Sequence, residues 1–185
     1  LKNIGIELDE KGFIPVDGCF RTQQPHIFAI GDIIKGALLA HRASQEAMAV
    51  VDFLTKNYST IDYISIPNVV YTSPEAASVG ITEQEALALP LETLVGISYF
   101  KGNPRARCAG ETAGLVKIIA EKKSKKVVGV HILGPHASEM IATGVILLQK
   151  RMCLKEVIET VFAHPTLSES IKEAALAAIG QPLHA

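Results

Sequence analysis

Two apolar runs joined by a lysine-rich turn decide the fold class of this chain: LVKIIA (residues 115–120), EKKSKK (121–126) and VVGVHIL (127–133). Short apolar runs rich in β-branched residues, with a short charged connection between them, predict an antiparallel two-stranded ribbon. Solvation and protection of a strand edge explain the lysines at its tip. The ribbon therefore predicts an antiparallel sheet in this part of the chain.

The segments on either side of the ribbon predict further strands and helices. Upstream we expect strands at residues 69–72 and 95–100. Between them we expect a helix that starts at the capping box of residues 82–85, and after them a polar loop at residues 103–107. Downstream, apolar residues at helical spacing predict three helices, at residues 137–151, at 154–161 and from 166 to 179. Together these elements predict an α+β fold, in which helices pack on an antiparallel sheet.

The first sixty residues give a different pattern. We expect a hairpin that turns at Lys11-Gly12, and a short buried strand over residues 27–30 that ends at Gly31-Asp32. Apolar residues then recur at helical spacing from Leu39 to Leu54. A polar stretch follows this helix, and we place a domain boundary between residues 62 and 63.

Composition excludes several function classes. The chain has 18 basic and 19 acidic residues and a net charge of −1, which gives it no electrostatic attraction to nucleic acid or to an anionic membrane. No apolar run approaches the roughly 20 residues that span a bilayer. Cys19, Cys108 and Cys153 lie too far apart for a disulfide framework or a zinc site. His136 and Glu139 have no further ligands in range, so no metal site is expected.

The most informative motif is the hexapeptide His164-Pro165-Thr166-Leu167-Ser168-Glu169. A histidine just before a helix can reach an open site, and the carboxylate five residues later could orient it as a general base. Thr166-x-x-Glu169 is also a capping box, so Glu169 could simply close the start of the helix. Spacing alone favours capping, although one geometry can serve both purposes.

A second candidate site lies at the end of the strand expected over residues 27–30. Asp32 could accept hydrogen bonds from sugar or polyol hydroxyls there, or it could cap a turn. The helix start at Leu39-Ala40-His41 would present backbone amides to an anionic or electron-rich group. Taken singly, His41 and Arg42 are expected to be surface residues.

The order of these motifs along the chain resembles the pyridine nucleotide–disulfide oxidoreductase family. The matching stretches are Ile27-Phe28-Ala29-Ile30-Gly31-Asp32, Leu39-Ala40-His41, Val70-Tyr71-Thr72-x-Pro74-Glu75-x-x-x-Val79-Gly80, His131-Ile132-Leu133-Gly134, and the hexapeptide from His164 to Glu169. The last motif is similar to that of the dihydrolipoamide dehydrogenase branch. The resemblance covers essentially the whole chain.

This resemblance implies two parts with different roles. Residues 1–62 would be the returning segment of an FAD-binding domain, and residues 63–185 would be the interface (dimerisation) domain. Asp32 would accept hydrogen bonds from the ribityl chain of the flavin. The helix start at Leu39-Ala40-His41 would place backbone amides near the electron-rich edge of the isoalloxazine ring.

The resemblance also assigns roles to the hexapeptide. His164 would be the general base that takes a proton from a dithiol substrate, with Glu169 orienting it. In this family the histidine acts on the opposite subunit, so a homodimer is implied. A cis peptide bond is implied at His164-Pro165, which proline permits.

The implied activity is oxidation of dihydrolipoamide with NAD as co-substrate, in the cytoplasm or the mitochondrial matrix. The implied partners are the lipoyl-bearing subunits of 2-oxo acid dehydrogenase complexes. The chain has neither a closely spaced cysteine pair nor a glycine-rich dinucleotide fingerprint, and it begins at Leu1. We therefore expect a fragment that is inactive alone and binds no FAD tightly. Two alternatives stay open: a glutathione-reductase-like enzyme, and a stand-alone dimerisation module in which His164 and Glu169 are structural.

Overall fold

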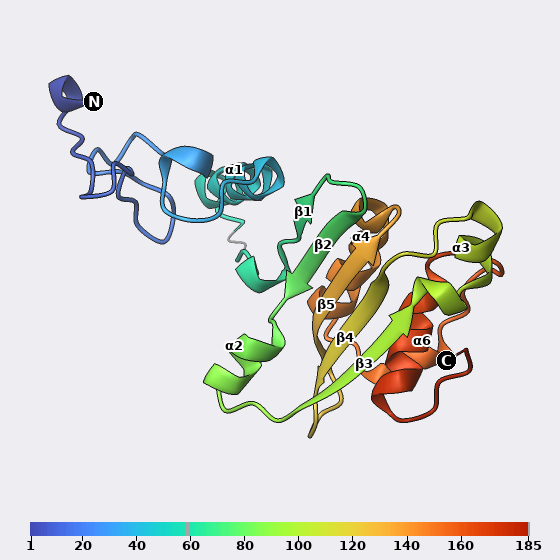
Figure 1. Ribbon diagram of the computed structural model, residues 1–185. Helices are drawn as coiled ribbons and strands as arrows, with labels where there is room; N and C mark the ends of the chain where they lie inside the picture. Colours follow the sequence, from blue (N-terminus) through green and yellow to red (C-terminus); the bar gives the residue numbers. More distant parts are fainter. Residues whose placement is uncertain (58–59, 185) are drawn as a thin grey trace. The chain divides into compact units, whose positions relative to one another are not determined.

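The computed structural model describes residues 1–57 and 60–184, which form two compact units, Leu1–Tyr63 and Ile64–Ala185. The second unit contains a five-stranded sheet in the order β1-β2-β5-β4-β3, in which every neighbouring pair is antiparallel (Figure 1). Its strands are β1 (Asn68–Val70), β2 (Glu75–Gly80), β3 (Thr93–Tyr99), β4 (Leu115–Glu121) and β5 (Val127–Gly134). Its helices are α2 (Glu83–Ala88), α3 (Pro104–Ala109), α4 (Ala137–Gln149), α5 (Leu154–Glu159) and α6 (Glu169–Ala178). The expected α+β fold is therefore confirmed.

The predicted ribbon is the centre of the sheet. Strands β4 and β5 pair antiparallel, with Val116 opposite Ile132 and Ile118 opposite Val130. Successive side chains of a strand point to opposite faces, so these four residues share one face. All four are at most 2% exposed, and they belong to the main hydrophobic core.

Two helices cover that face of the sheet. Helix α4 packs on β5 and β2, and helix α6 packs on β3 and β4 (Figure 1). The approach of α6 is close because β3 has Gly96 at the contact, where a Cβ atom would lie 2.0 Å from the Ala174 carbonyl oxygen and 2.3 Å from the Ala178 nitrogen. Gly96 thus sets how closely α6 lies against the sheet.

None of the described helices has both the length and the hydrophobicity that a membrane span requires.

Two elements of this unit differ from the sequence-based expectation. Residues 75–80 form β2, which the alanine-rich sequence did not predict because alanine has little preference for strands. The expected polar loop at 103–107 is instead the start of helix α3. Asn103 caps this helix by accepting a hydrogen bond from the Ala106 nitrogen, and Pro104 occupies its first turn, where proline is favoured.

The first unit contains one long helix, α1 (Ala40–Leu54), and the short 3₁₀ turns η1 (Lys2–Ile4) and η2 (Gly31–Ile33); a further 3₁₀ turn, η3 (Tyr63–Ser65), follows. The helix was predicted. The turn at Lys11-Gly12 forms around the Asp9 carboxylate, but the predicted hairpin is wrong, because none of the described residues on either side of the turn lies in a strand. The strand predicted over residues 27–30 is wrong. Only an isolated bridge between Arg21 and Phe28 forms, because the described residues of this unit offer no neighbouring strand with which a ladder could form.

We expect the variant Gly96→Ala to destabilise the second unit, because the added methyl group would meet the backbone of α6. Overpacking of this kind costs about 1–3 kcal/mol. Unfolding in urea would measure the loss. Gly18→Ala is the matched control, since a Cβ atom there meets nothing within 4 Å. Equal stability of Gly96→Ala and the wild type would contradict the close packing of α6 on β3.

Candidate functional site

His164 lies in the loop between α5 and α6, and its side chain is 65% exposed. The peptide bond between His164 and Pro165 is cis, as the resemblance implied. The Nδ1 atom of His164 lies 2.9 Å from Oε1 of Glu169. An ionised carboxylate can only accept a hydrogen bond, so Nδ1 carries the proton of the neutral ring. The other ring nitrogen, Nε2, then has a free lone pair with which it can accept a proton.

The second carboxylate oxygen of Glu169 has a different partner. Oε2 accepts a hydrogen bond of 2.7 Å from the Thr166 backbone nitrogen, one of the two bonds of the expected capping box, although α6 begins at Glu169 itself with Ser168 as its N-cap. The Thr166 hydroxyl does not complete the box, because it donates to the Ala163 carbonyl oxygen instead. Burial raises the pKa of Glu169, but the Thr166 amide and His164 outweigh it, and the pKa is lowered overall. One side chain therefore orients the histidine and binds the backbone of the preceding loop at the same time.

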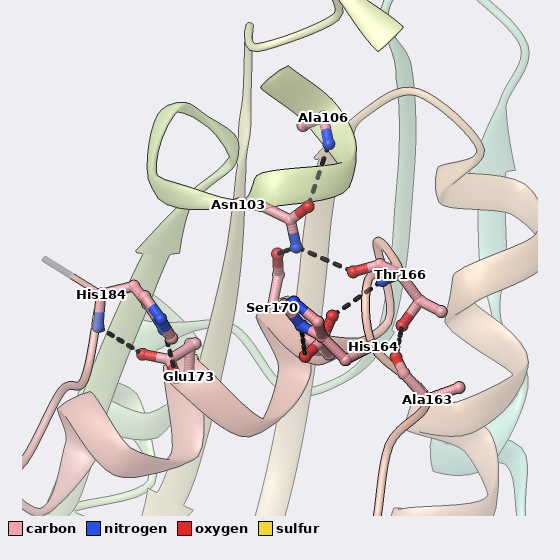
Figure 2. A network of polar contacts seen from close by, with 9 residues as sticks. Asn103, Ala106, Ala163, His164, Thr166, Ser170, Glu173 and His184 are labelled. Atoms are coloured by element: carbon pink, nitrogen blue, oxygen red, sulfur yellow. Dashed lines mark hydrogen bonds and ion pairs between the residues drawn. The ribbon is translucent and has the colours of Figure 1, made fainter. Parts of the chain in front are cut away.

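Asn103 holds this loop against the rest of the domain (Figure 2). Its side-chain nitrogen donates to the Thr166 carbonyl oxygen at 2.9 Å and lies 3.0 Å from the Ser170 hydroxyl. Its side-chain oxygen caps α3 through the Ala106 nitrogen at 3.0 Å. Sequence reasoning placed Asn103 in a solvated loop and missed it. The Asn-Pro pair at a helix start was the available signal.

A second imidazole–carboxylate pair lies beside the first. The Glu173 carboxylate accepts a hydrogen bond from the His184 backbone nitrogen and lies 3.1 Å from Nδ1 of His184 (Figure 2). It also accepts one from the Leu183 backbone nitrogen. Glu173 is 12% exposed, and both pairs line one small cavity of about 20 Å³. Sequence reasoning also missed this pair, because nothing local connects residues 173 and 184.

The remaining predicted site residues belong to the first unit. Asp32 lies in η2 and is exposed. Leu39 is the N-cap residue of α1 and makes no side-chain capping bond, while Ala40 and His41 begin the helix. The structure thus pairs His164 with Glu169 in one unit, and Asp32 and residues 39–41 lie in the other.

The expectation that Arg42 is a surface residue is wrong. Arg42 is 3% exposed, and its Nε atom lies 2.7 Å from the Glu46 carboxylate, which is fully buried. Its other nitrogens donate to the carbonyl oxygens of Ala37 and Lys35, at 2.7 and 2.9 Å. Glu46 in turn accepts hydrogen bonds from the Gly31 nitrogen at 2.7 Å and from the Tyr63 hydroxyl at 3.0 Å. Burial raises the pKa of Tyr63, and the Glu46 carboxylate raises it further.

This buried ion pair fixes the segment that carries Asp32 against the start of α1. An exposed carboxylate and a helix start without a side-chain cap suit the hydroxyls and the electron-rich ring edge of a flavin. The residues of this unit therefore fit part of an FAD site. Among the residues that the structure describes, no cluster of three potential ligands could hold a metal ion.

Comparison with known proteins gives matches along almost the whole chain. Residues 1–47 match the family model described as pyridine nucleotide-disulphide oxidoreductase, and residues 66–175 match the dimerisation domain of the same family. The chain is 42% identical over 184 residues to a dihydrolipoamide dehydrogenase from Chaetomium thermophilum, of which it covers 36%. It is 44% identical over 184 residues to the mitochondrial dihydrolipoyl dehydrogenase of Pisum sativum, of which it covers 37%. Both alignments cover 100% of this chain.

A solved structure gives the same result for the fold. The crystal structure of LpdA from Mycobacterium tuberculosis matches with a TM-score of 0.86 and 30% identity, and the match covers 94% of this chain and 38% of LpdA. The chain thus spans little more than a third of the length of the relatives that it matches. With both family models and these identities in agreement, the chain belongs to the pyridine nucleotide-disulphide oxidoreductase family.

Proposed function

We propose that the protein containing this chain is a flavin-dependent oxidoreductase that oxidises dihydrolipoamide with NAD as co-substrate. The observation that carries this proposal is the 2.9 Å contact between His164 and Glu169, which leaves Nε2 available as a base. Identities of 42–44% to dihydrolipoamide and dihydrolipoyl dehydrogenases over the whole chain support this substrate. They favour it over a glutathione-reductase-like activity and over a stand-alone dimerisation module.

His164 acts in this proposal on the protons of the substrate. A thiol near neutral pH is mostly protonated, whereas the thiolate is the species that attacks a disulfide. Nε2 takes the thiol proton, and Glu169 stabilises the imidazolium that forms. Oxidation of the dithiol to a disulfide releases two electrons and two protons, and NAD⁺ finally accepts the electrons and one proton as a hydride. FAD, when bound, supplies the carrier for the electron pair between dithiol and NAD⁺.

The two units have different parts in this scheme. We propose that residues 1–62 belong to an FAD-binding domain, in which Asp32 binds the ribityl hydroxyls and Leu39-Ala40-His41 face the flavin ring. Residues 63–185 form the interface domain of a homodimer, to which the match with the family's dimerisation domain points. The chain contains neither a closely spaced cysteine pair nor a glycine-rich fingerprint, and we expect no turnover from it alone.

Partners and compartment follow from the proposed substrate. Dihydrolipoamide groups are carried by the lipoyl-bearing subunits of 2-oxo acid dehydrogenase complexes, which we propose as partners. Three widely spaced cysteines suit a reducing compartment, either cytoplasm or mitochondrial matrix. Mitochondrial relatives from plants and mammals support the second of these.

The variant His164→Gln tests the base directly. In the full-length gene product it should lower NAD-coupled oxidation of dihydrolipoamide by about 10²–10⁴-fold, because glutamine cannot accept the thiol proton. The flavin absorbance should remain. His26→Gln, which changes an exposed histidine of the first unit, is the matched control. Turnover of His164→Gln at the wild-type rate would rule out His164 as the base.

Low pH tests the charge of Glu169. Its lowered pKa means that the carboxylate is favoured in the folded state, so its stabilisation is present above about pH 4.5 and is lost as the pH falls further. The free energy of unfolding of Glu169→Gln should therefore lie below that of the wild type at pH 6, by about 1–2 kcal/mol, and this difference should shrink at pH 3.5. Urea unfolding at both pH values measures it. A difference that does not depend on pH would contradict an ionised Glu169.

A further inference from the structure

Asn103 connects two segments of the second unit that lie more than 60 residues apart in the sequence. It follows β3 and the 3₁₀ turn η4 (Phe100–Gly102), and it is 5% exposed. Its hydrogen bonds reach the His164 loop at Thr166, helix α6 at Ser170 and helix α3 at Ala106. A buried amide with both of its ends bonded holds its neighbours in one arrangement.

The His164 loop is held by a long-range hydrogen bond from this amide and by the packing of Leu167 against the main core. Thr166, two residues after His164, uses its nitrogen and its hydroxyl for bonds to Glu169 and Ala163, and these partners lie within the same short segment. Of the bonds made by Thr166, the one from Asn103 to its carbonyl oxygen is the one that reaches 63 residues back along the chain. The loop therefore bonds to itself and to Glu169 at the start of α6, and Asn103 ties it to the start of α3 (Figure 2).

We propose that Asn103 is a positioning residue for the base. Through its bond to the Thr166 carbonyl oxygen, Asn103 keeps His164 and Glu169 at a fixed place relative to the rest of the site. This inference rests on the proposed function of His164. Loss of the attachment moves the imidazole without removing it. A misplacement of about 1 Å lowers a rate by as much as about 10²-fold.

Substitutions of Asn103 can separate its two roles, which are to cap α3 and to bond the Thr166 carbonyl oxygen. In Asn103→Asp a carboxylate oxygen still accepts from the Ala106 nitrogen, and Asp caps a helix as well as Asn does. The other oxygen cannot donate, and it would repel the Thr166 carbonyl oxygen. Asn103→Ser is the neutral second variant, because a serine hydroxyl also caps α3 but is too short to reach the loop. It stays informative if the buried charge of aspartate prevents folding.

Thr82→Ala is the matched control. Thr82 caps helix α2 of the same unit through the Glu85 nitrogen, at a place that does not touch the His164 loop. Its loss lowers stability as a missing N-cap does. A loss of kcat in the Asn103 variants that exceeds the loss in Thr82→Ala is then due to displacement of the His164 loop.

The experiment measures NAD-coupled oxidation of dihydrolipoamide by the full-length gene product across the pH range, per bound flavin. We expect Asn103→Asp and Asn103→Ser to lower kcat by about 10–100-fold with KM little changed, and Thr82→Ala to retain the wild-type kcat. The acidic limb of the kcat/KM profile should move to lower pH in Asn103→Ser, because the loop that carries His164 is then less firmly held beside Glu169, which belongs to α6, and the carboxylate stabilises the imidazolium less well. Glu173 and His184 also face this cavity and are unchanged in all variants.

The outcomes separate the two proposals. Wild-type protein that does not oxidise dihydrolipoamide would overturn the proposed function, and this inference with it. An active wild type together with an Asn103→Ser variant whose kcat and pH profile match those of Thr82→Ala would overturn the positioning role alone.

Discussion

The Glu169 carboxylate has two oxygens, and the arrangement of the candidate site depends on their separate use. Oε2 accepts a hydrogen bond from the Thr166 amide in the loop before α6, while Oε1 accepts one from Nδ1 of His164. A carboxylate that bonded only to the Thr166 amide would leave the imidazole free to rotate. A carboxylate that only held the imidazole would itself lack an anchor. Because the same group does both, the direction of the histidine ring is tied to the axis of α6.

The position of α6 is in turn set by close contact with the sheet. Gly96 allows the backbone of α6 to approach β3 at a point where any side chain would collide. The antiparallel register of β3, β4 and β5 then fixes where the N-terminal end of α6 lies, which is beside Asn103 and the start of α3. Apolar packing thus places the helix, and a small number of polar bonds place the loop that precedes it.

In the first unit, too, polar side chains hold a loop in place, and here they form a buried ion pair. The buried guanidinium of Arg42 binds the carbonyl oxygens of Lys35 and Ala37, and Glu46 binds the Gly31 amide. An irregular segment, in which few backbone groups bond to one another, is held by side chains of the helix that follows it. Removing one partner would leave a buried charge unpaired, which destabilises a fold far more than loss of an exposed ion pair. In both units a loop with candidate site residues is fixed by side chains from a rigid helix or strand.

Elements whose pattern is local were predictable from the residues alone: the β4–β5 ribbon, the helical spacing of α1 and α4, the capping box of α2 and the hexapeptide at His164. These follow from period, turn composition and capping, which act over a few residues. The folded chain settled three further features: residues 75–80 form a strand, residues 27–30 do not, and Arg42 is buried. It also brought Asn103 to Thr166 and Glu173 to His184. Each of these depends on a partner that is distant in the sequence, and a strand without a neighbour or a polar group without its partner has no local signal.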